Sequence, residues 1–202
     1  MSGSAPLVVC AGAGRTYGAG RTATVALHLM AGLDAPSVGT VTWPAIGPRE
    51  ALRPGPVAVV FQGPSLLPPL TVEENVALPL ILGGRGDADA RAAARAALAL
   101  LDLQALRDKL PEELSGGQAQ RVAVCRALAG APALILADEP TGQLDRTSGT
   151  AVVDVLLAAA EHAGAALVVA THDPAVSRRL AERWELHSGR LVTASKEAAW
   201  SR

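Results

Sequence analysis

The sequence predicts an α/β fold built on a mostly parallel β-sheet. Three short apolar runs, at residues 57–62, 133–139 and 166–173, end abruptly in polar or acidic residues. Such runs are typical of strands that are buried on both faces of a parallel sheet. Segments rich in strong helix formers alternate with them, as in βαβ units. A chain of 202 residues, half of them apolar, is long enough to bury the core of one domain.

Local signals place the other elements along the chain. The helix expected at residues 147–164 stops at Gly164, because glycine readily adopts the left-handed backbone found just past helix ends. Asp173 is a good N-cap residue, and Pro174 follows it at the first helical position. A fourth apolar run, at 6–10, is likewise expected to be a buried parallel strand. The remaining expected elements are helices at 87–109, 117–130 and 173–184, and a terminal hairpin at 184–192 that turns at Ser188-Gly189.

Composition argues against several classes of protein. The formal net charge is -1, so the chain lacks the excess of basic residues typical of nucleic-acid-binding proteins, and it does not indicate an acidic tail. Two cysteines make no disulfide framework, which suits a reducing compartment. The N-terminus is a poor signal peptide, and no apolar run is long enough to cross a membrane unaided. We therefore expect a cytoplasmic chain.

Polar residues stand at the carboxyl ends of the three predicted parallel strands, where α/β sheets bind their ligands. They are Gln62, the pair Asp138 and Glu139, and His172. Two adjacent carboxylates at the end of a buried strand are costly unless a cation or a hydrogen-bond donor accompanies them. Asp138 is suited to hold Mg²⁺ through water, and Glu139 to orient or deprotonate an attacking water. Taken singly, these residues also fit a solvated turn or an ordinary polar strand end.

The stretch LSGGQAQRVAVCRAL, residues 114–128, leads from two glycines straight into a helix. Free backbone N–H groups and the helix dipole favour an anion at such a helix start. Gly116 and Gly117 also allow another backbone or a ligand to approach closely. A flexible loop that caps an amphipathic helix explains this stretch alone, but it does not explain the motifs that follow it.

Four motifs together resemble the ATPase subunits of ABC transporters. FQGPSLLPPLTVEENVALPL is similar to the Q-loop and LSGGQAQRVAVCRAL to the signature motif, while LILADEPTGQLD and THD resemble the Walker B motif with its D-loop and the H-loop. Their order and spacing match too, and the resemblance runs from about His28 to Val192. The wording is most similar to the branch that serves lipoprotein release, macrolide-type export and cell division. Several linked motifs make the resemblance specific.

The resemblance implies roles for the residues at the strand ends. Gln62 would contact Mg²⁺ or the attacking water and sense the membrane subunit. Asp138 would hold Mg²⁺, and Glu139 would be the catalytic base. His172 would be the switch histidine that contacts the γ-phosphate.

The resemblance also implies a second set of residues, which serve the nucleotide of an opposite subunit. Ser115, Gly116, Gly117 and Gln118 would press on the γ-phosphate of ATP held by that subunit. Asp145 would lie in the D-loop at the seam of the dimer.

The lysine of the family's phosphate-binding loop, G-x-x-x-x-G-K-[ST], is missing. In that loop, backbone N–H groups cradle the phosphates, the lysine reaches the β and γ oxygens, and Ser/Thr binds Mg²⁺. The only two lysines, Lys109 and Lys196, lie far from any such loop. An ungapped match of residues 28–34 to the family's post-loop helix puts Ala23 at the lysine position and Thr24 at the Ser/Thr position.

Two other alignments are open. In one, Arg21-Thr22 imitates Lys-Ser after the glycines of residues 18–20. In the other, the run at 6–10 becomes the central strand of the sheet and the stretch after it becomes a degenerate phosphate loop.

We favour a deletion. The segment around Tyr17 resembles the part of the family that carries the adenine-stacking tyrosine, and Tyr17 would then be a nucleotide contact. Only ten residues separate Tyr17 from His28, which leaves no room for the hairpin, central strand and phosphate loop expected between them. The segment ending near Leu27 would thus be joined directly to the helix starting near His28. Loss of such a phosphate clamp lowers catalysis by on the order of 10²-fold or more.

The resemblance implies one ABC-type ATPase domain over residues 1–202, with a helical signature subdomain at about 63–130 and a truncated N-terminal part. This P-loop NTPase-like subunit would use ATP and Mg²⁺ to drive a membrane permease from the inner face of the cell membrane. A second ATP-binding subunit would complete a homo- or heterodimer, and no nucleic acid is expected as a partner. Hydrolysis by this chain is expected to be impaired.

Two other classes of function stay open. A non-hydrolysing interaction module would lend its signature motif to the ATP of another subunit. A Rossmann-type oxidoreductase would use the G-x-G of residues 8–14 and Asp34 as a ribose-binding acid, but Tyr17 occupies the place of the third glycine of that fingerprint.

Overall fold

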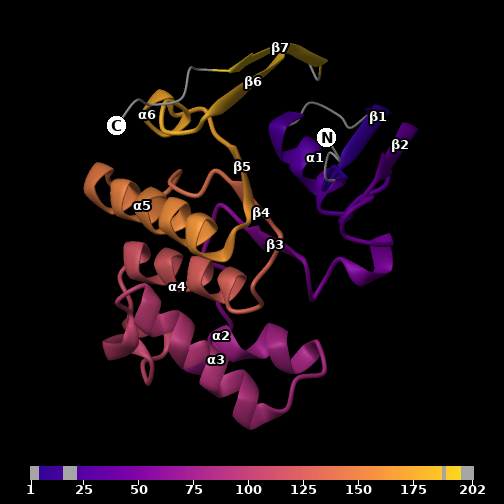
Figure 1. Cartoon of the computed structure of the whole chain (residues 1–202). Helices are drawn as coiled ribbons and strands as arrows, with labels where there is room; N and C mark the ends of the chain where they lie inside the picture. The colour runs from indigo at the N-terminus through magenta and orange to yellow at the C-terminus, as the bar shows by residue number, and fades with distance from the viewer. Residues whose placement is uncertain (1–4, 16–21, 188–189, 197–202) are drawn as a thin grey trace.

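A three-stranded parallel sheet lies at the centre of the molecule (Figure 1). The computed structural model describes residues 5–15, 22–187 and 190–196. The sheet has the order β3 (Val57–Val60), β4 (Leu134–Asp138) and β5 (Ala166–Ala170). Three of the four apolar runs predicted as parallel strands are therefore confirmed. β4 is buried along its whole length, because it is the middle strand and both of its faces are covered.

Helices cover both faces of this sheet (Figure 1). On one face lie α4 (Gly116–Leu128) and α5 (Arg146–Ala163), and on the other lies α1 (Thr22–Met30). The buried core under α4 and α5 consists of Val60, Val124, Ile135, Ala137, Val152, Leu156 and Ala160. The buried core on the α1 side consists of Leu27, Ala31, Trp43, Leu52, Val57, Leu134 and Leu136. This layered arrangement confirms the predicted α/β fold class.

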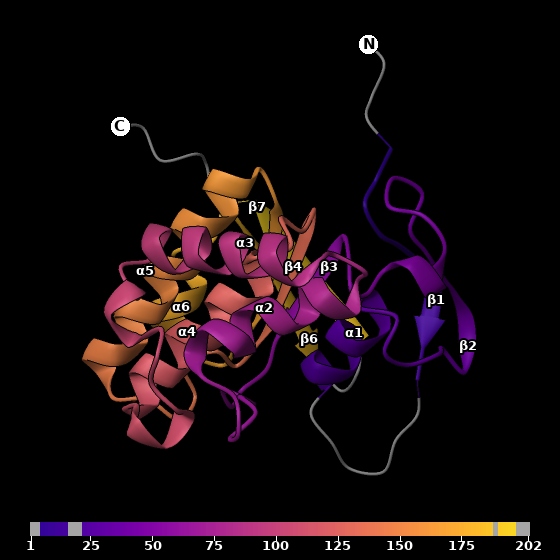
Figure 2. The ribbon, with the colours of Figure 1, turned by 90° about the horizontal axis from the view of Figure 1, so that it is seen from below.

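A helical region packs against α4, which lies between this region and α5 in Figure 1; Figure 2 shows the same region from below. It contains α2 (Val72–Leu82), α3 (Asp87–Leu100) and two short 3-10 turns, Gln104–Leu106 and Pro111–Glu113. Its core includes Val76, Leu98 and Cys125, none more than 1% exposed. The expected signature subdomain at about 63–130 coincides with these elements, and we keep that division as a prediction.

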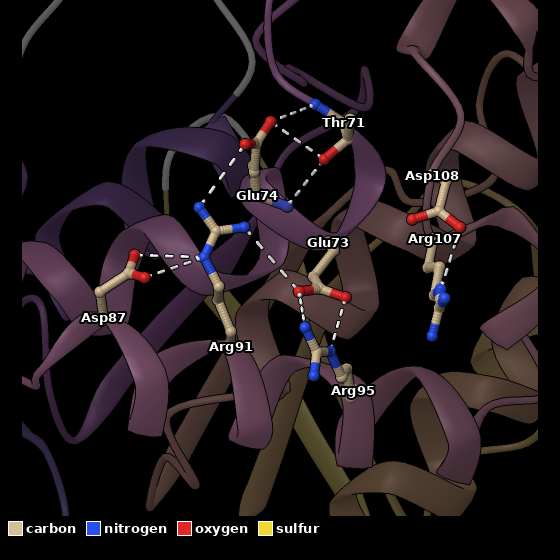
Figure 3. Close-up of polar contacts among 8 residues, drawn as sticks. All are labelled: Thr71, Glu73, Glu74, Asp87, Arg91, Arg95, Arg107 and Asp108. Atoms are coloured by element: carbon tan, nitrogen blue, oxygen red, sulfur yellow. Dashed lines mark hydrogen bonds and ion pairs between the residues drawn. The ribbon is translucent and has the colours of Figure 1, made fainter.

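A network of ion pairs joins α2 to α3 (Figure 3). Glu73, 6% exposed, accepts hydrogen bonds from Nε and Nη2 of Arg95 at 2.8 and 2.9 Å. Arg91 lies between Asp87, Glu73 and Glu74, with its closest contact of 3.0 Å to Asp87. A buried carboxylate is stable only when it is paired in this way. The two helices are thus held together by polar contacts as well as by their shared core.

Two small antiparallel sheets flank the central one. β1 (Val9–Gly14) pairs with β2 (Val38–Thr42), which follows α1, and the 3-10 turn Arg49–Ala51 comes next. β6 (Glu182–His187) pairs with β7 (Arg190–Lys196). The predicted terminal hairpin is confirmed, but its turn residues lie outside the described residues. Within the described residues, no helix has both the length and the apolar character needed to cross a membrane.

Three expectations about elements were wrong. The run at 6–10 was expected to be a buried parallel strand, but the strand there is Val9–Gly14, antiparallel and largely exposed. The alternative in which this run becomes the central strand is therefore also wrong. The helix at 87–109 ends at Leu100, because Asp102 adopts a φ of 55° that an α-helix does not allow.

The third error concerns the helix expected at 173–184. α6 spans only Pro174–Ser177, although its predicted cap is present, with Asp173 accepting a hydrogen bond from the Ala175 N–H at 2.7 Å. The rest of the predicted helix includes the first half of β6, whose pairing with β7 overrides its helical propensity. The other boundaries agree with the predictions to within a few residues, including Gly164 at a φ of 61° after α5.

Candidate functional site

Asp138 ends β4 at the carboxyl edge of the sheet, where the sequence predicts a ligand site. It is 7% exposed, and its Oδ1 accepts a hydrogen bond of 3.0 Å from Oγ1 of Thr24. Thr24 lies in the first turn of α1, which packs over the same sheet. The structure thus brings together a carboxylate and a hydroxyl from segments 114 residues apart.

The pair formed by Thr24 and Asp138 fits a magnesium ion. Mg²⁺ prefers hard oxygen ligands, and it is held by one or two carboxylates together with substrate phosphates and water rather than by an all-protein cage. Among the described residues no group of three or more His, Cys, Asp or Glu side chains is placed to hold a metal. Any metal bound here would therefore rely on oxygen atoms of a ligand, as a nucleotide-bound Mg²⁺ does.

Glu139 is the next residue, and it contacts the end of β5. Its Oε1 accepts the backbone N–H of His172 at 3.1 Å and lies 2.8 Å from Nδ1 of the same residue. Its Oε2 accepts the Thr171 hydroxyl at 3.3 Å. Glu139 has a φ of 44°, a conformation that is strained for a residue other than glycine and that clusters at functional sites. A pocket of about 330 Å³ lies here, lined by Glu139, His172 and residues around them.

Gln62 faces the same turn from the end of β3. A Cβ atom added to Gly142 would lie 3.1 Å from Nε2 of Gln62 and 3.4 Å from the backbone oxygen of Glu139. Gly142 therefore makes room for Gln62 beside the turn that carries Glu139. Sequence reasoning predicted Gln62, Asp138, Glu139 and His172 as one site, and the structure gathers all four at one edge of the sheet. It missed Thr171 and Gly142, although both lie inside the quoted THD and Walker B stretches.

The residues of the signature motif lie together at the start of α4. Ser115 is the N-cap, and its Oγ accepts the backbone N–H of Gln118 at 3.2 Å, while Oε1 of Gln118 accepts the Ser115 N–H at 2.9 Å. This reciprocal capping box fixes the helix start. Ser115 and Gly116 are exposed. The remaining N–H groups of the first turn are the kind that bind anions.

Asp145 belongs with the signature residues rather than with the carboxylate pair. It caps α5 by accepting the N–H groups of Thr147 and Ser148 at 2.9 and 3.0 Å. Hydrogen bonds from Ser148 hold the pKa of Asp145 below its usual range. A Cβ on Gly117 would lie only 3.0 Å from Ser148, so the signature turn and the cap of α5 are in close contact. This arrangement brings the predicted signature residues and the predicted dimer-seam residue onto one surface.

The part of the site expected to bind the nucleotide phosphates is the part for which the structure describes the fewest of the predicted residues. Tyr17 and Arg21 lie outside the described residues, so neither the predicted nucleotide contact at Tyr17 nor the alignment on Arg21 is tested. Ala23 and Thr24 occupy the first turn of α1, which runs without a break through the proposed deletion junction at Leu27. Among the described strands, β5 has a neighbour only on its β4 side.

Comparisons with known proteins agree with this geometry. The family model described as ABC transporter matches residues 14–142, more than half of the chain. The lipoprotein-releasing system ATP-binding protein LolD of Bordetella pertussis is 42% identical over 172 residues, which cover 82% of this chain and 74% of LolD. LolD of a Shewanella species, strain MR-7, is 38% identical over 190 residues, which cover 91% of this chain and 81% of LolD.

Solved structures show the same similarity. The dimeric structure of MJ0796, a bacterial ABC transporter cassette, aligns with a TM-score of 0.76 at 35% identity, covering 88% of this chain and 81% of the cassette. A structure of cbiO1 from Clostridium perfringens aligns with a TM-score of 0.80 at 20% identity, which shows the fold alone.

Two adjacent carboxylates end a parallel strand, a histidine contacts the second of them, and a glycine-rich turn starts a neighbouring helix. Together these features define a nucleotide-binding domain of the P-loop ATPase class. The chain belongs to the ABC transporter family of such domains.

Proposed function

We propose that this chain is the ATP-binding subunit of a transporter and that it binds ATP with Mg²⁺ at the edge formed by β3, β4 and β5. The observation that carries the proposal is the contact of Thr24 with Asp138 beside the contact of Glu139 with His172. Bound Mg²⁺ would supply charge stabilisation to the phosphate oxygens. Thr24 and Asp138 would hold it, and Gln62 would approach it from β3.

Glu139 would orient the attacking water and accept its proton. His172 would hold the Glu139 carboxylate through the hydrogen bond at Nδ1, and it presents an exposed ring to the ligand, since its side chain is 84% exposed. The strained backbone at Glu139 is held by the bond from its N–H to the Ala170 oxygen at 2.9 Å. These contacts keep the proposed base in one position before a nucleotide arrives.

Hydrolysis by this chain would be weak. The position of Thr24 beside Asp138 supports the ungapped alignment, which leaves Ala23 where the family has its lysine. Alanine supplies no positive charge to the β and γ oxygens, so the rate would fall by on the order of 10²-fold or more. Because α1 is one continuous helix from Thr22, we propose that any shortening of the chain lies before Thr22 rather than at Leu27.

A dimer would complete the function. The exposed start of α4 and the cap at Asp145 share one surface, which suits closure over the ATP of a second ATP-binding subunit. A homodimer would join two sites without lysine, whereas a heterodimer would pair this signature motif with an intact site. The second candidate function, a non-hydrolysing partner of that kind, is favoured by the same combination of a formed signature turn and an absent lysine.

The membrane permease would dock on a groove of about 480 Å³ between β3, the second half of α2 and the end of α4. Its lining is mostly apolar and includes Leu33, Phe61 and Leu82, which are 43%, 39% and 71% exposed. Such exposed apolar surface marks an interaction site. The subunit would thus lie on the inner face of the cell membrane, and similarity to LolD favours a lipoprotein-releasing transporter.

The proposal is tested by equilibrium binding of a fluorescent ATP analogue, with and without Mg²⁺, to the purified chain. We expect binding that is weak but strengthened by Mg²⁺, and displaced by ATP but not by NAD or NADP. Displacement of the analogue by NAD or NADP would instead favour the oxidoreductase. Affinity that does not change with Mg²⁺ would contradict the assignment of Thr24 and Asp138 as magnesium ligands.

A further inference from the structure

Gln120 in the signature helix α4 is hydrogen-bonded to the backbone just before Gln62, at the end of β3. Gln120 is 1% exposed, and its Nε2 donates a hydrogen bond of 3.0 Å to the backbone oxygen of Phe61. A buried amide of this kind is kept only where its hydrogen bonds are made, since an unpaired buried donor costs stability. Phe61 directly precedes Gln62, so this bond holds the chain at the point where the loop begins.

Arg126, six residues further along α4, ties the loop on its other side. Its Nη1 donates to the backbone oxygen of Ser65 at 2.9 Å, and its Nη2 to the Ser65 hydroxyl at 2.8 Å and to the Pro64 oxygen at 3.4 Å. Ser65 has a φ of 44°, which is strained for serine and persists only where surrounding contacts hold it.

Arg126 is partly buried. Burial lowers the pKa of its guanidinium, and its hydrogen-bond partners are neutral oxygens rather than a carboxylate. Planar guanidinium groups suit several fixed acceptors at once, which lysine does not match. The Arg126 guanidinium binds three oxygens of the loop, so these hydrogen bonds also hold the loop in place.

We infer that Gln120 and Arg126 are positioning residues that hold the loop on both sides of Gln62, so that Gln62 follows the signature helix. The loop from Phe61 to Ser65 is thus bound to α4 while Gln62 itself lies against Gly142 near Glu139. The importance of this arrangement for catalysis rests on the proposed function. The hydrogen bonds from Gln120 and Arg126 to the loop, which we call the tether, form without a nucleotide.

Hydrogen exchange of the full chain, without nucleotide, tests the tether. Gln120→Met and Arg126→Met each remove the donors while keeping similar volume. We expect the amides of Gln62, Gly63, Ser65 and Leu66 to exchange faster by on the order of tenfold in each variant, because a buried or charged hydrogen bond is lost. The amides of β4 and α5 should exchange as in the wild type. Arg126→Lys, which keeps the charge and a donor, should restore part of the protection.

Arg121→Met is the matched control, because Arg121 lies on the same helix and no hydrogen bond from it to residues 61–66 is found in the part of the chain that the structure describes. The inference is overturned if the amides of Gln62, Gly63, Ser65 and Leu66 exchange as in the wild type in both Met variants, or if exchange rises equally in β4 and α5. Should Arg126→Met fail to fold, Gln120→Met and Arg126→Lys decide the question by the same criterion. None of these outcomes depends on whether the chain binds ATP.

Discussion

The hydroxyl of Thr24 in α1 donates a hydrogen bond of 3.0 Å to Oδ1 of Asp138 at the end of β4. The hydroxyl and the carboxylate occupy the two positions at which the resemblance implies magnesium ligands from the chain. We propose that Ala23 takes the position of the missing lysine. The proposed site would then have its Mg²⁺ ligands and its catalytic base but no lysine to contact the phosphates.

Replacing Thr24 by valine removes this hydrogen bond without changing the shape of the side chain much. We expect a loss of about 1 kcal/mol in the free energy of unfolding, because buried Asp138 loses a donor. We also expect the Mg²⁺ dependence of ATP-analogue binding to weaken. Urea unfolding and binding titrations check both effects. Thr24→Ser keeps the hydroxyl and should behave as the wild type; a valine variant equal to the wild type in both assays would contradict the assignment.

Replacing Glu139 by glutamine removes the proposed base but keeps one of its two side-chain oxygens and the size of the side chain. We expect residual ATP hydrolysis to fall by on the order of 10²-fold or more. ATP-analogue affinity should stay within about threefold, since the binding oxygens are elsewhere. Phosphate release and size-exclusion chromatography with Mg-ATP measure the rate and the accumulation of dimers. An unchanged rate would mean that Glu139 is not the base.

The parallel strands and their polar ends could be predicted because both signals are local. An apolar run that stops at a polar residue marks a buried strand and its functional end, and the four residues at those ends lie together as expected. The partner of β1 could not be predicted, since strand pairing depends on distant segments. The same applies to residues 182–184, where helix propensity is overridden by pairing with β7.

Thr24 shows a different limit. Its hydroxyl had one proposed role among several alignments, and only the fold of α1 over β4 brings it to Asp138. Gly142 and Thr171 were missed because a glycine that makes room and a threonine that orients a carboxylate have no sequence signal apart from the motif around them.

Acid should weaken the cap of α2. Backbone and side-chain hydrogen bonds from Thr71, with the nearby Arg91 charge, hold the pKa of Glu74 below its usual range (Figure 3). A lowered pKa in the folded state stabilises the fold above the unfolded pKa of about 4.3, and this contribution is lost as pH falls through the folded value. The Glu74 side chain is 34% exposed, so solvent screening keeps the contribution small.

Thr71→Ala should therefore cost about 1 kcal/mol at pH 7, as expected for an N-cap, and less near pH 3. Urea unfolding at both pH values measures this difference. Thr150→Ala on α5 is the control, because the Thr150 hydroxyl donates to a backbone oxygen. Its cost in the free energy of unfolding should be the same at both pH values. A cost for Thr71→Ala that is equal at the two pH values would contradict the linkage.

The two thiols should differ sharply in reactivity. Cys125 is fully buried in the core under α2 and α3, and burial raises its pKa to about 12, whereas Cys10 is exposed. Because the thiolate is the reactive form, only Cys10 should react with a thiol reagent at pH 8 in the folded chain. Urea should release the second thiol, and Cys10→Ser should leave none reactive without urea. Equal labelling of both thiols in the folded chain would contradict the packing of α4.

The central claim is that residue 23 is the lysine position of an otherwise formed nucleotide site. It is tested most directly by the affinity of a fluorescent ATP analogue with Mg²⁺ for the wild type, Ala23→Lys and Ala23→Met. The account predicts weak binding by the wild type and by Ala23→Met, and binding tighter by at least about tenfold for Ala23→Lys, because an ammonium group reaches the phosphates. Micromolar binding by the wild type that Ala23→Lys leaves unchanged would contradict it and would mean that another group clamps the phosphates.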